Sequence, residues 1–116
     1  MLEVEKWLTE QCDNGGIPGQ TAKIALSTVR QLRKQITDLP DAAAMYGEDG
    51  EIGLDFDFEL DTEDAAIWLS FQVNTDWTID WMLSGPSREP QDWDSHSGIP
   101  ADMVTQLNAW LANAKK

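Results

Sequence analysis

The feature that most constrains the fold is an alternation of apolar and polar residues over positions 52–61. Successive side chains of a strand point to opposite faces, so this pattern predicts a strand with one buried and one solvated face. The apolar residues are Ile52, Leu54, Phe56, Phe58 and Leu60, and between them lie Gly53, Asp55, Asp57, Glu59 and Asp61.

Two more strands are expected, at about 65–73 and 77–84, because apolar residues again recur at every second position. The polar segments 61–64 and 74–76 have the length of hairpin loops, so the three strands should form an antiparallel meander. Residues 41–51 are interpreted as a linker ending in a turn. Residues 85–98, rich in Gly, Pro, Ser and Asp, are interpreted as a long loop.

Three helices are predicted from apolar residues at three- and four-residue spacing, at 2–12, at about 20–38 and from Pro100 onward. Gly15-Gly16 and Pro18-Gly19 should separate the first two helices, and Pro40 should prevent the second from continuing. The expected fold is a single α+β domain over 1–116. It has a three-stranded antiparallel meander, with two N-terminal helices and one C-terminal helix packed on its apolar face.

The other face of this sheet is the candidate binding surface. If Leu60 faces Ala65, and Val73 faces Trp77, then Asp57 lies opposite Trp68 and Trp68 lies opposite Met82. Ser70 would then pair with Asp55 on one side and with Asp80 on the other. The residues proposed to contact a partner are Asp55, Asp57, Glu59, Trp68, Asp80 and Met82. Two alternatives remain open: the face is simply solvated, or a helix covers part of it and buries Trp68.

Net charge limits the kind of partner. The chain has 21 Asp and Glu against 8 Lys and Arg, a formal net charge of −13, and the acids are concentrated after residue 34. A chain without a basic footprint is not expected to bind nucleic acid or an anionic membrane directly. A single cysteine, Cys12, and an N-terminus unlike a signal peptide favour a cytoplasmic location.

Signals for catalysis are weak, so no catalytic residue, cofactor or metal is expected. Cys12 and His96 are far apart in sequence, and no glycine-rich phosphate-binding motif is present. The best metal candidates are Asp92, Asp94 and His96, at alternate positions, which lack the layout of a calcium loop. A second candidate is the acidic turn of Glu48, Asp49 and Glu51.

The hypothesis that follows is a non-enzymatic module that occludes a basic, nucleic-acid-binding protein. In size, charge and fold style the chain resembles small acidic DNA-mimic inhibitors encoded by phages, of the anti-CRISPR kind, and acidic immunity proteins or antitoxins that neutralise basic toxins. The alternative is a structural or accessory subunit in which acidity serves only solubility. The oligomeric state, monomer or homodimer, stays open.

Overall fold

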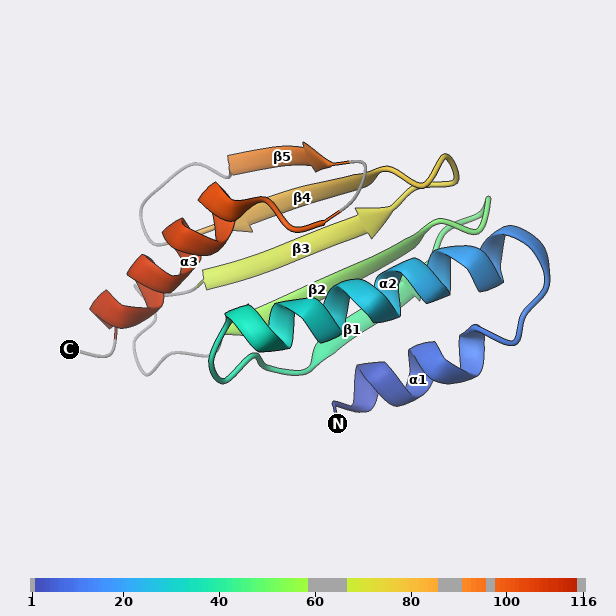
Figure 1. The fold of residues 1–116 in the computed structure, drawn as a ribbon, viewed down its shortest axis with the longest axis horizontal. Coiled ribbons are helices and arrows are strands. Elements are labelled where there is room, and N and C mark those ends of the chain that lie inside the picture. The colour runs from blue at the N-terminus through green and yellow to red at the C-terminus, as the bar shows by residue number, and fades with distance from the viewer. Residues whose placement is uncertain (1, 59–66, 86–90, 96–97, 115–116) are drawn as a thin grey trace.

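The structure is a computed structural model that describes residues 2–58, 67–85, 91–95 and 98–114. Its elements in chain order are α1 (Glu3–Gln11), α2 (Gly16–Gln35), β1 (Ala42–Tyr46), β2 (Ile52–Phe58), β3 (Ile67–Val73), β4 (Ile79–Ser84), β5 (Gln91–Ser95) and α3 (Ala101–Ala114). Figure 1 shows this arrangement. None of the helices, within these described residues, is long and apolar enough to span a membrane.

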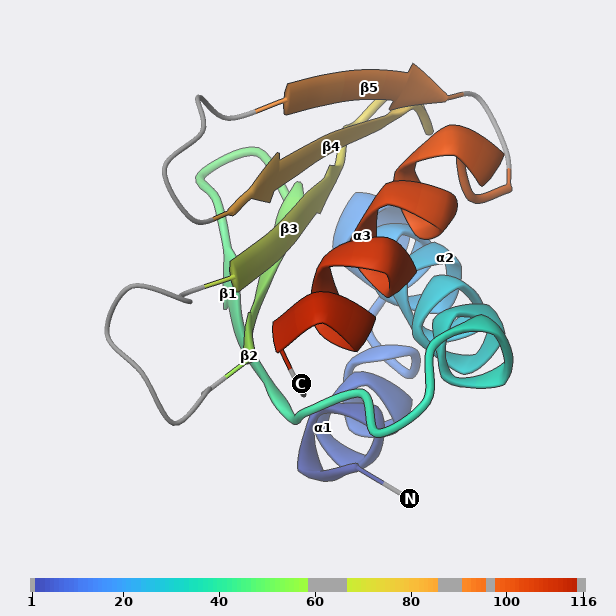
Figure 2. The same ribbon diagram turned by 90° about the vertical axis from the view of Figure 1, so that its left-hand side faces the viewer.

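The strands form one antiparallel sheet in the order β1-β2-β3-β4-β5. All three helices lie on the same side of this sheet (Figure 2). The α+β class and the packing of the helices on one face are therefore confirmed. The prediction of a three-stranded meander is wrong, because the sheet gains an additional strand at each edge.

Both missed strands belong to segments that lack a clear signal for a strand. β1 is Ala42-Ala43-Ala44-Met45-Tyr46, where no polar residue alternates with the apolar ones and alanine has a low strand propensity. β5 is Gln91-Asp92-Trp93-Asp94-Ser95, a short alternating segment between Pro90 and Gly98. Turn residues and acids around these segments favour a loop, so tertiary pairing with β2 and β4 overrides the local preference.

The second hairpin differs from the predicted register by two residues. Val73 pairs with Ile79 instead of Trp77, so Trp68 faces Ser84, Ser70 faces Met82 and Gln72 faces Asp80. Trp77 lies in the turn, with φ of 71° and its backbone N–H donating to the Asn74 carbonyl at 3.0 Å. A turn followed by a left-handed residue is a common three-residue hairpin connection, which moves Trp77 out of the strand.

The helix limits also differ from the predicted ones at α2. It begins at Gly16 rather than near residue 20, and it ends at Gln35 rather than residue 38. Pro18 does not delay the start, because a proline in the first helical turn has no hydrogen bond to lose. The hydroxyl of Thr21 on this helix donates to the Gly50 carbonyl at 2.6 Å, which holds the β1–β2 turn against the helix.

The core lies between the sheet and the helices. The strands bury one side chain in two, including Phe56, Phe71 and the fully buried Trp81. The Trp81 indole N–H donates to the Ser95 hydroxyl at 3.0 Å, which links β4 to β5. On α3, Trp110 packs so closely over Gly85 that a Cβ at this glycine would lie 2.3 Å from its ring.

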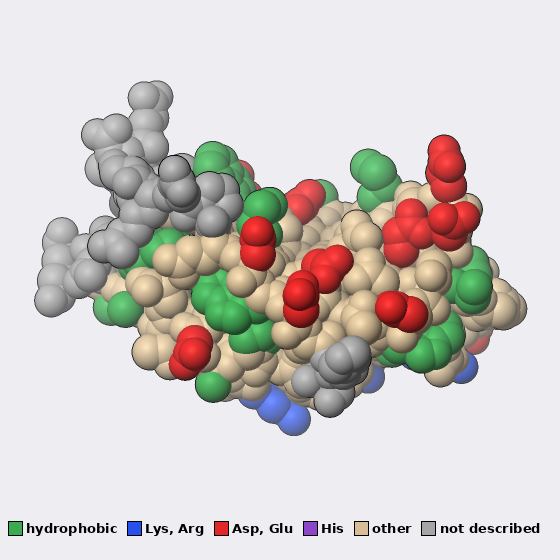
Figure 3. All heavy atoms as spheres, turned by 90° about the horizontal axis from the view of Figure 1, so that it is seen from above, with side chains coloured by type: hydrophobic (Ala, Val, Ile, Leu, Met, Phe, Trp, Pro, Cys, Tyr) green, Lys and Arg blue, Asp and Glu red, His purple; other side chains and the backbone are tan. Residues whose placement is uncertain are grey.

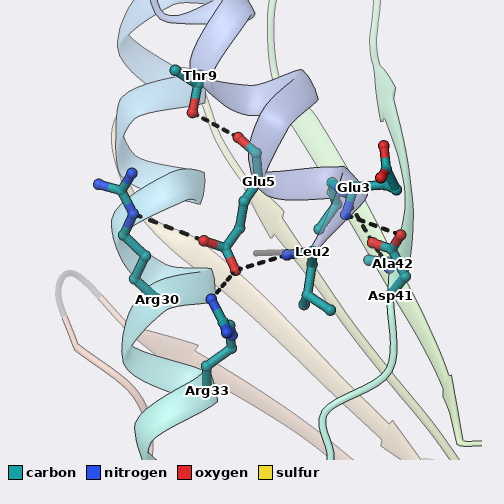
Figure 4. A network of polar contacts seen from close by, with 9 residues as sticks. Leu2, Glu3, Glu5, Thr9, Arg30, Arg33, Asp41 and Ala42 are labelled. Carbon is teal, nitrogen blue, oxygen red and sulfur yellow. Dashed lines mark hydrogen bonds and ion pairs between the residues drawn. The ribbon is translucent and has the colours of Figure 1, made fainter.

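A buried carboxylate joins α1 to α2 (Figure 4). Glu5 is only 2% exposed and accepts a hydrogen bond from Nη1 of Arg33 at 2.6 Å, with Nε of Arg30 at 4.0 Å. The Leu2 backbone N–H also points to Glu5, at 3.5 Å. A buried charge needs such partners, because an unpaired carboxylate inside the fold is costly. The pairing explains part of the basic character of α2.

The start of α1 is fixed by a carboxylate from another segment of the chain. The carboxylate of Asp41, just before β1, accepts hydrogen bonds from the backbone N–H of Glu3 at 3.2 Å and of Val4 at 3.0 Å (Figure 4). The first N–H groups of a helix have no partner within the helix, so this carboxylate satisfies them and complements the helix dipole.

The Glu5 contacts lead to a stability prediction. Replacing Arg33 by Ala leaves the buried carboxylate without its short hydrogen bond, so we expect the free energy of unfolding to fall by about 2 kcal/mol. Arg30→Ala makes the same change of charge but removes only the longer, more exposed contact, and should cost less than about 1 kcal/mol. Urea denaturation of the two variants measures both values. Equal losses would contradict the assignment of Arg33 as the main partner.

Candidate functional site

The side of the sheet that faces away from the helices is called the open face here. Successive side chains of each strand alternate between the core and this face. These residues are Ala43 and Met45 on β1, Gly53, Asp55 and Asp57 on β2, Trp68, Ser70 and Gln72 on β3, Asp80, Met82 and Ser84 on β4, and Asp92 and Asp94 on β5. None of the helices in the described part of the chain covers them (Figure 2).

The open face carries five aspartates, and none of the Lys or Arg residues within the described segments lies on it. The described cations, Lys6, Lys23, Arg30, Arg33 and Lys34, all belong to α1 and α2 on the other side. Figure 3 views the molecule from above, where acidic side chains are spread over the surface and basic ones are visible only along its lower margin. The described cations are therefore confined to the helix side of the sheet, where acids such as Glu3, Glu5 and Glu10 also lie, whereas the charged side chains of the open face are all acidic.

The aspartates form two groups separated by β3. Asp55 and Asp57 lie on β2, whereas Asp80, Asp92 and Asp94 lie on β4 and β5. Since neighbouring strands are about 4.8 Å apart, β2 and β4 are separated by roughly 10 Å. Between them, the Ser70 hydroxyl donates to Oδ1 of Asp55 at 2.5 Å, which fixes the orientation of this carboxylate.

Asp80 and Asp94 face each other directly across β4 and β5. Like charges in this arrangement destabilise a strand pair. A hydrogen bond between the two carboxyl groups, followed by the negative charges of Asp80 and Asp92, raises the pKa of Asp94 above its ordinary value of 3.8. Asp80 gains partial compensation from the side-chain amide of Asn74, which donates to its Oδ2 at 3.1 Å.

Three large apolar side chains are exposed among these acids. Met45 is 74% exposed, Trp68 48% and Met82 42%. Trp68 pairs with Asp57 on β2, and Met82 lies between Ser70 on β3 and Asp92 on β5. An aromatic or Met side chain surrounded by polar groups is typical of the energetic centre of a protein interface.

The structure brings most of the predicted site residues onto one face. Asp55, Asp57, Trp68, Asp80 and Met82 all lie on the open face, and Glu59 lies outside the described residues. The alternative in which a helix covers this face and buries Trp68 is wrong, because all helices pack on the other side.

The spacing of the site residues differs from the prediction in the second hairpin. Trp68 faces Ser84 and not Met82, so the tryptophan and the methionine are displaced by two residues along the strands. Asp80 lies beside Gln72 and Asp94 rather than beside Ser70. The error follows from the position of Trp77 in the turn.

Sequence reasoning missed the open-face residues of both edge strands, which are Ala43 and Met45 on β1 and Asp92 and Asp94 on β5. The two aspartates were considered only as metal ligands together with His96, which lies outside the described residues. Within the segments that the structure describes, no group of three or more His, Cys, Asp or Glu side chains is arranged to hold a metal ion. The alternation Asp92-Trp93-Asp94 was the available signal for a strand, with Trp93 turned toward the core.

Repulsion between Asp80 and Asp94 should be visible in the pH dependence of stability. A carboxyl group with a raised folded-state pKa stabilises the fold at acidic pH and loses this contribution as pH rises through that pKa. Asp94→Asn should therefore raise the melting temperature at neutral pH, with the gain disappearing as pH falls below the ordinary pKa of 3.8.

The control for this variant is Asp57→Asn, which removes one charge from the same face but has Trp68, not a carboxylate, as its partner on β3. Thermal unfolding followed by circular dichroism at several pH values compares the two. A similar gain in both variants would mean that total charge, and not the Asp80–Asp94 pair, causes the effect.

Comparison with known proteins gives no match: no family model fits the sequence, and no curated protein or solved structure is similar to the chain. A function must therefore be argued from the chemistry of the open face.

Proposed function

We propose that the protein is a non-enzymatic binding module that docks its open face onto a basic, nucleic-acid-binding protein and blocks the site where nucleic acid would bind. The observation that carries this proposal is the arrangement of five aspartates around exposed Trp68 and Met82 on a sheet face without a covering helix.

The fixed positions of the carboxylates support the proposal. Same-face residues on one strand are about 6.6 Å apart, a spacing of the same order as one step of a nucleic-acid backbone. Asp55 is additionally held by Ser70 and Asp80 by Asn74. Side chains that are ordered before binding lose less entropy on binding, and a face of one sign steers a basic partner toward itself.

Exposed apolar side chains argue against acidity that serves solubility alone. A surface selected only for solubility has no need to place Met45, Trp68 and Met82 on the same side of the sheet as the acids. Such side chains provide short-range contact area, while the aspartates provide attraction at longer range. An accessory subunit that assembles through its helices would not require this combination.

The same chemistry serves an immunity protein or antitoxin whose target is a basic toxin. The two versions differ in the identity of the target, and the contacts of the open face are the same in both. Either version predicts an association rate that falls steeply as salt rises from low to physiological concentration. A rate indifferent to salt would contradict both.

Reversal of charge on the open face tests the proposal. Asp57→Lys combined with Asp80→Lys places two cations on the face, where each would meet a basic partner. We expect binding to weaken by at least about 100-fold, because like-charge contacts at an interface cost several kcal/mol. Both side chains are exposed, so the fold should survive, and the new lysine at position 80 would face Asp94.

The matched control is Glu48→Lys combined with Asp49→Lys, in the exposed β1–β2 turn. Both double variants change the net charge by the same amount, from −13 to about −9. The wild-type protein and the two double variants are each used to capture partners from a lysate of the organism that encodes the protein. DNA binding by a captured partner is then measured in the presence and absence of the wild-type protein or the variant. Equal loss in both variants would mean that only total charge matters. A captured partner without a basic nucleic-acid-binding surface would contradict the proposal.

A further inference from the structure

The open face contains a hollow of about 800 Å³ that runs across the strands from β1 to β5. Its lining includes Ala43 and Met45 at one end, Gly53 and Met82 between, and Asp92 and Asp94 at the other end. Trp68 and Asp57 do not line it, because they lie two residues farther along the strands than Ser70 and Asp55. The hollow is open to solvent, whereas sites for small molecules enclose most of their ligand, so its shape fits a segment of a macromolecule.

The two ends of the hollow differ in chemistry. At the β4–β5 end lie three carboxylates, those of Asp80, Asp92 and Asp94. At the β1 end lie the small side chain of Ala43 and the exposed thioether of Met45. Asp55 and Glu51 also line this end, where their carboxylates already accept hydrogen bonds from the Ser70 hydroxyl and the Asp49 backbone N–H. Met82 lies beside Asp92 and provides a second flexible apolar contact. An occupant of matching chemistry has cationic side chains at one end and apolar side chains at the other.

The backbone of the sheet restricts the conformation of the occupant. On β2, β3 and β4 the N–H and C=O groups are used in ladders with strands on both sides. An extended segment laid on this face would find no backbone partners there, whereas an α-helix satisfies its own backbone groups. Five strands at a spacing of about 4.8 Å span roughly 19 Å, the length of about 13 helical residues.

We propose that the hollow receives a helix of the target protein, laid across the strands, that is amphipathic along its length, with basic side chains toward one end and apolar side chains toward the other. Its Lys or Arg side chains lie against Asp80, Asp92 and Asp94, and its apolar side chains contact Met82 and Met45. This inference rests on the proposed function and adds to it the kind of segment that the open face recognises.

Gly53 gives a way to test the hollow without changing charge. It lies on the open face between Met45 on β1 and Gln72 on β3. A Cβ built at this glycine meets nothing within 4 Å. Gly53→Phe should therefore be accepted by the strand and extend a ring into the hollow, because aromatic residues favour strands. Gly53→Ala is the matched control, since it removes the glycine without filling the space.

The experiment uses two fluorescent 14-residue peptides of the same Lys and Leu composition. One, the amphipathic peptide, has its leucines in one half of the helix and its lysines in the other half. The other has the same residues in scrambled order. We expect the wild-type protein and Gly53→Ala to bind the amphipathic peptide at least tenfold more tightly than the scrambled one, as measured by fluorescence anisotropy at physiological salt. Gly53→Phe should lose this preference while retaining its circular dichroism spectrum and melting temperature.

Other outcomes distinguish the helix proposal from the proposed function. Equal binding of both peptides, lost with Asp57→Lys and Asp80→Lys, would overturn the helix and leave an acidic docking face. Absence of binding by either peptide, even at low salt, would contradict the docking face itself. Preferential binding that Gly53→Phe leaves intact would place the helix elsewhere and overturn the proposal. The protein could also self-associate at low salt. If the amphipathic peptide does not reverse this self-association, the occupant of the hollow is the basic α2 of a second copy, and the proposal of a helix from a target protein is overturned.

Discussion

The whole arrangement depends on one constraint, that the apolar side chains of the sheet all point to the same side. Alternation along β2, β3 and β4 places a continuous apolar surface on that side, and burial of this surface is the main driving force available to the fold. Because α1, α2 and α3 all cover it, the described segments leave no helix for the opposite side. The open face is therefore a direct consequence of how the core is built.

The same constraint determines how the fold accommodates its charge. Cations are concentrated on α2, where Arg33 and Arg30 meet the buried Glu5, so they do not offset the aspartates across the sheet. The carboxylates of the open face repel one another, most directly at Asp80 and Asp94. A basic partner would relieve this repulsion, so part of the stability lost within the free protein would be regained in the complex.

The sequence predicts those parts of the fold in which the local pattern and tertiary packing agree. β2 and β3 were predicted with their faces and with the pairing of Asp57 and Trp68, because alternation there is strict. The strand β1 could not be predicted because alanine has a low strand propensity, and β5 could not be predicted because turn residues flank it. Neither segment would prefer a strand in isolation.

The candidate site inherits these limits. Asp55, Asp57, Asp80 and Met82 could be placed on one face because side-chain alternation alone determines it. Their distances could not be predicted, because a left-handed Trp77 shifts the hairpin by two residues. The hollow could not be predicted either, since it needs all five strands.

Separation of the core from the open face has a consequence for how such a chain can vary. Side chains such as Met45, Asp57 and Met82 are exposed and make no part of the buried core, so exchanging them alters what the surface recognises and leaves folding to the other side of the sheet. Substitutions of these exposed side chains should therefore change the free energy of unfolding only slightly. Under the proposed function, one scaffold of this kind can follow a target whose own surface changes, or be adapted to a different target, without first acquiring compensating changes in its interior.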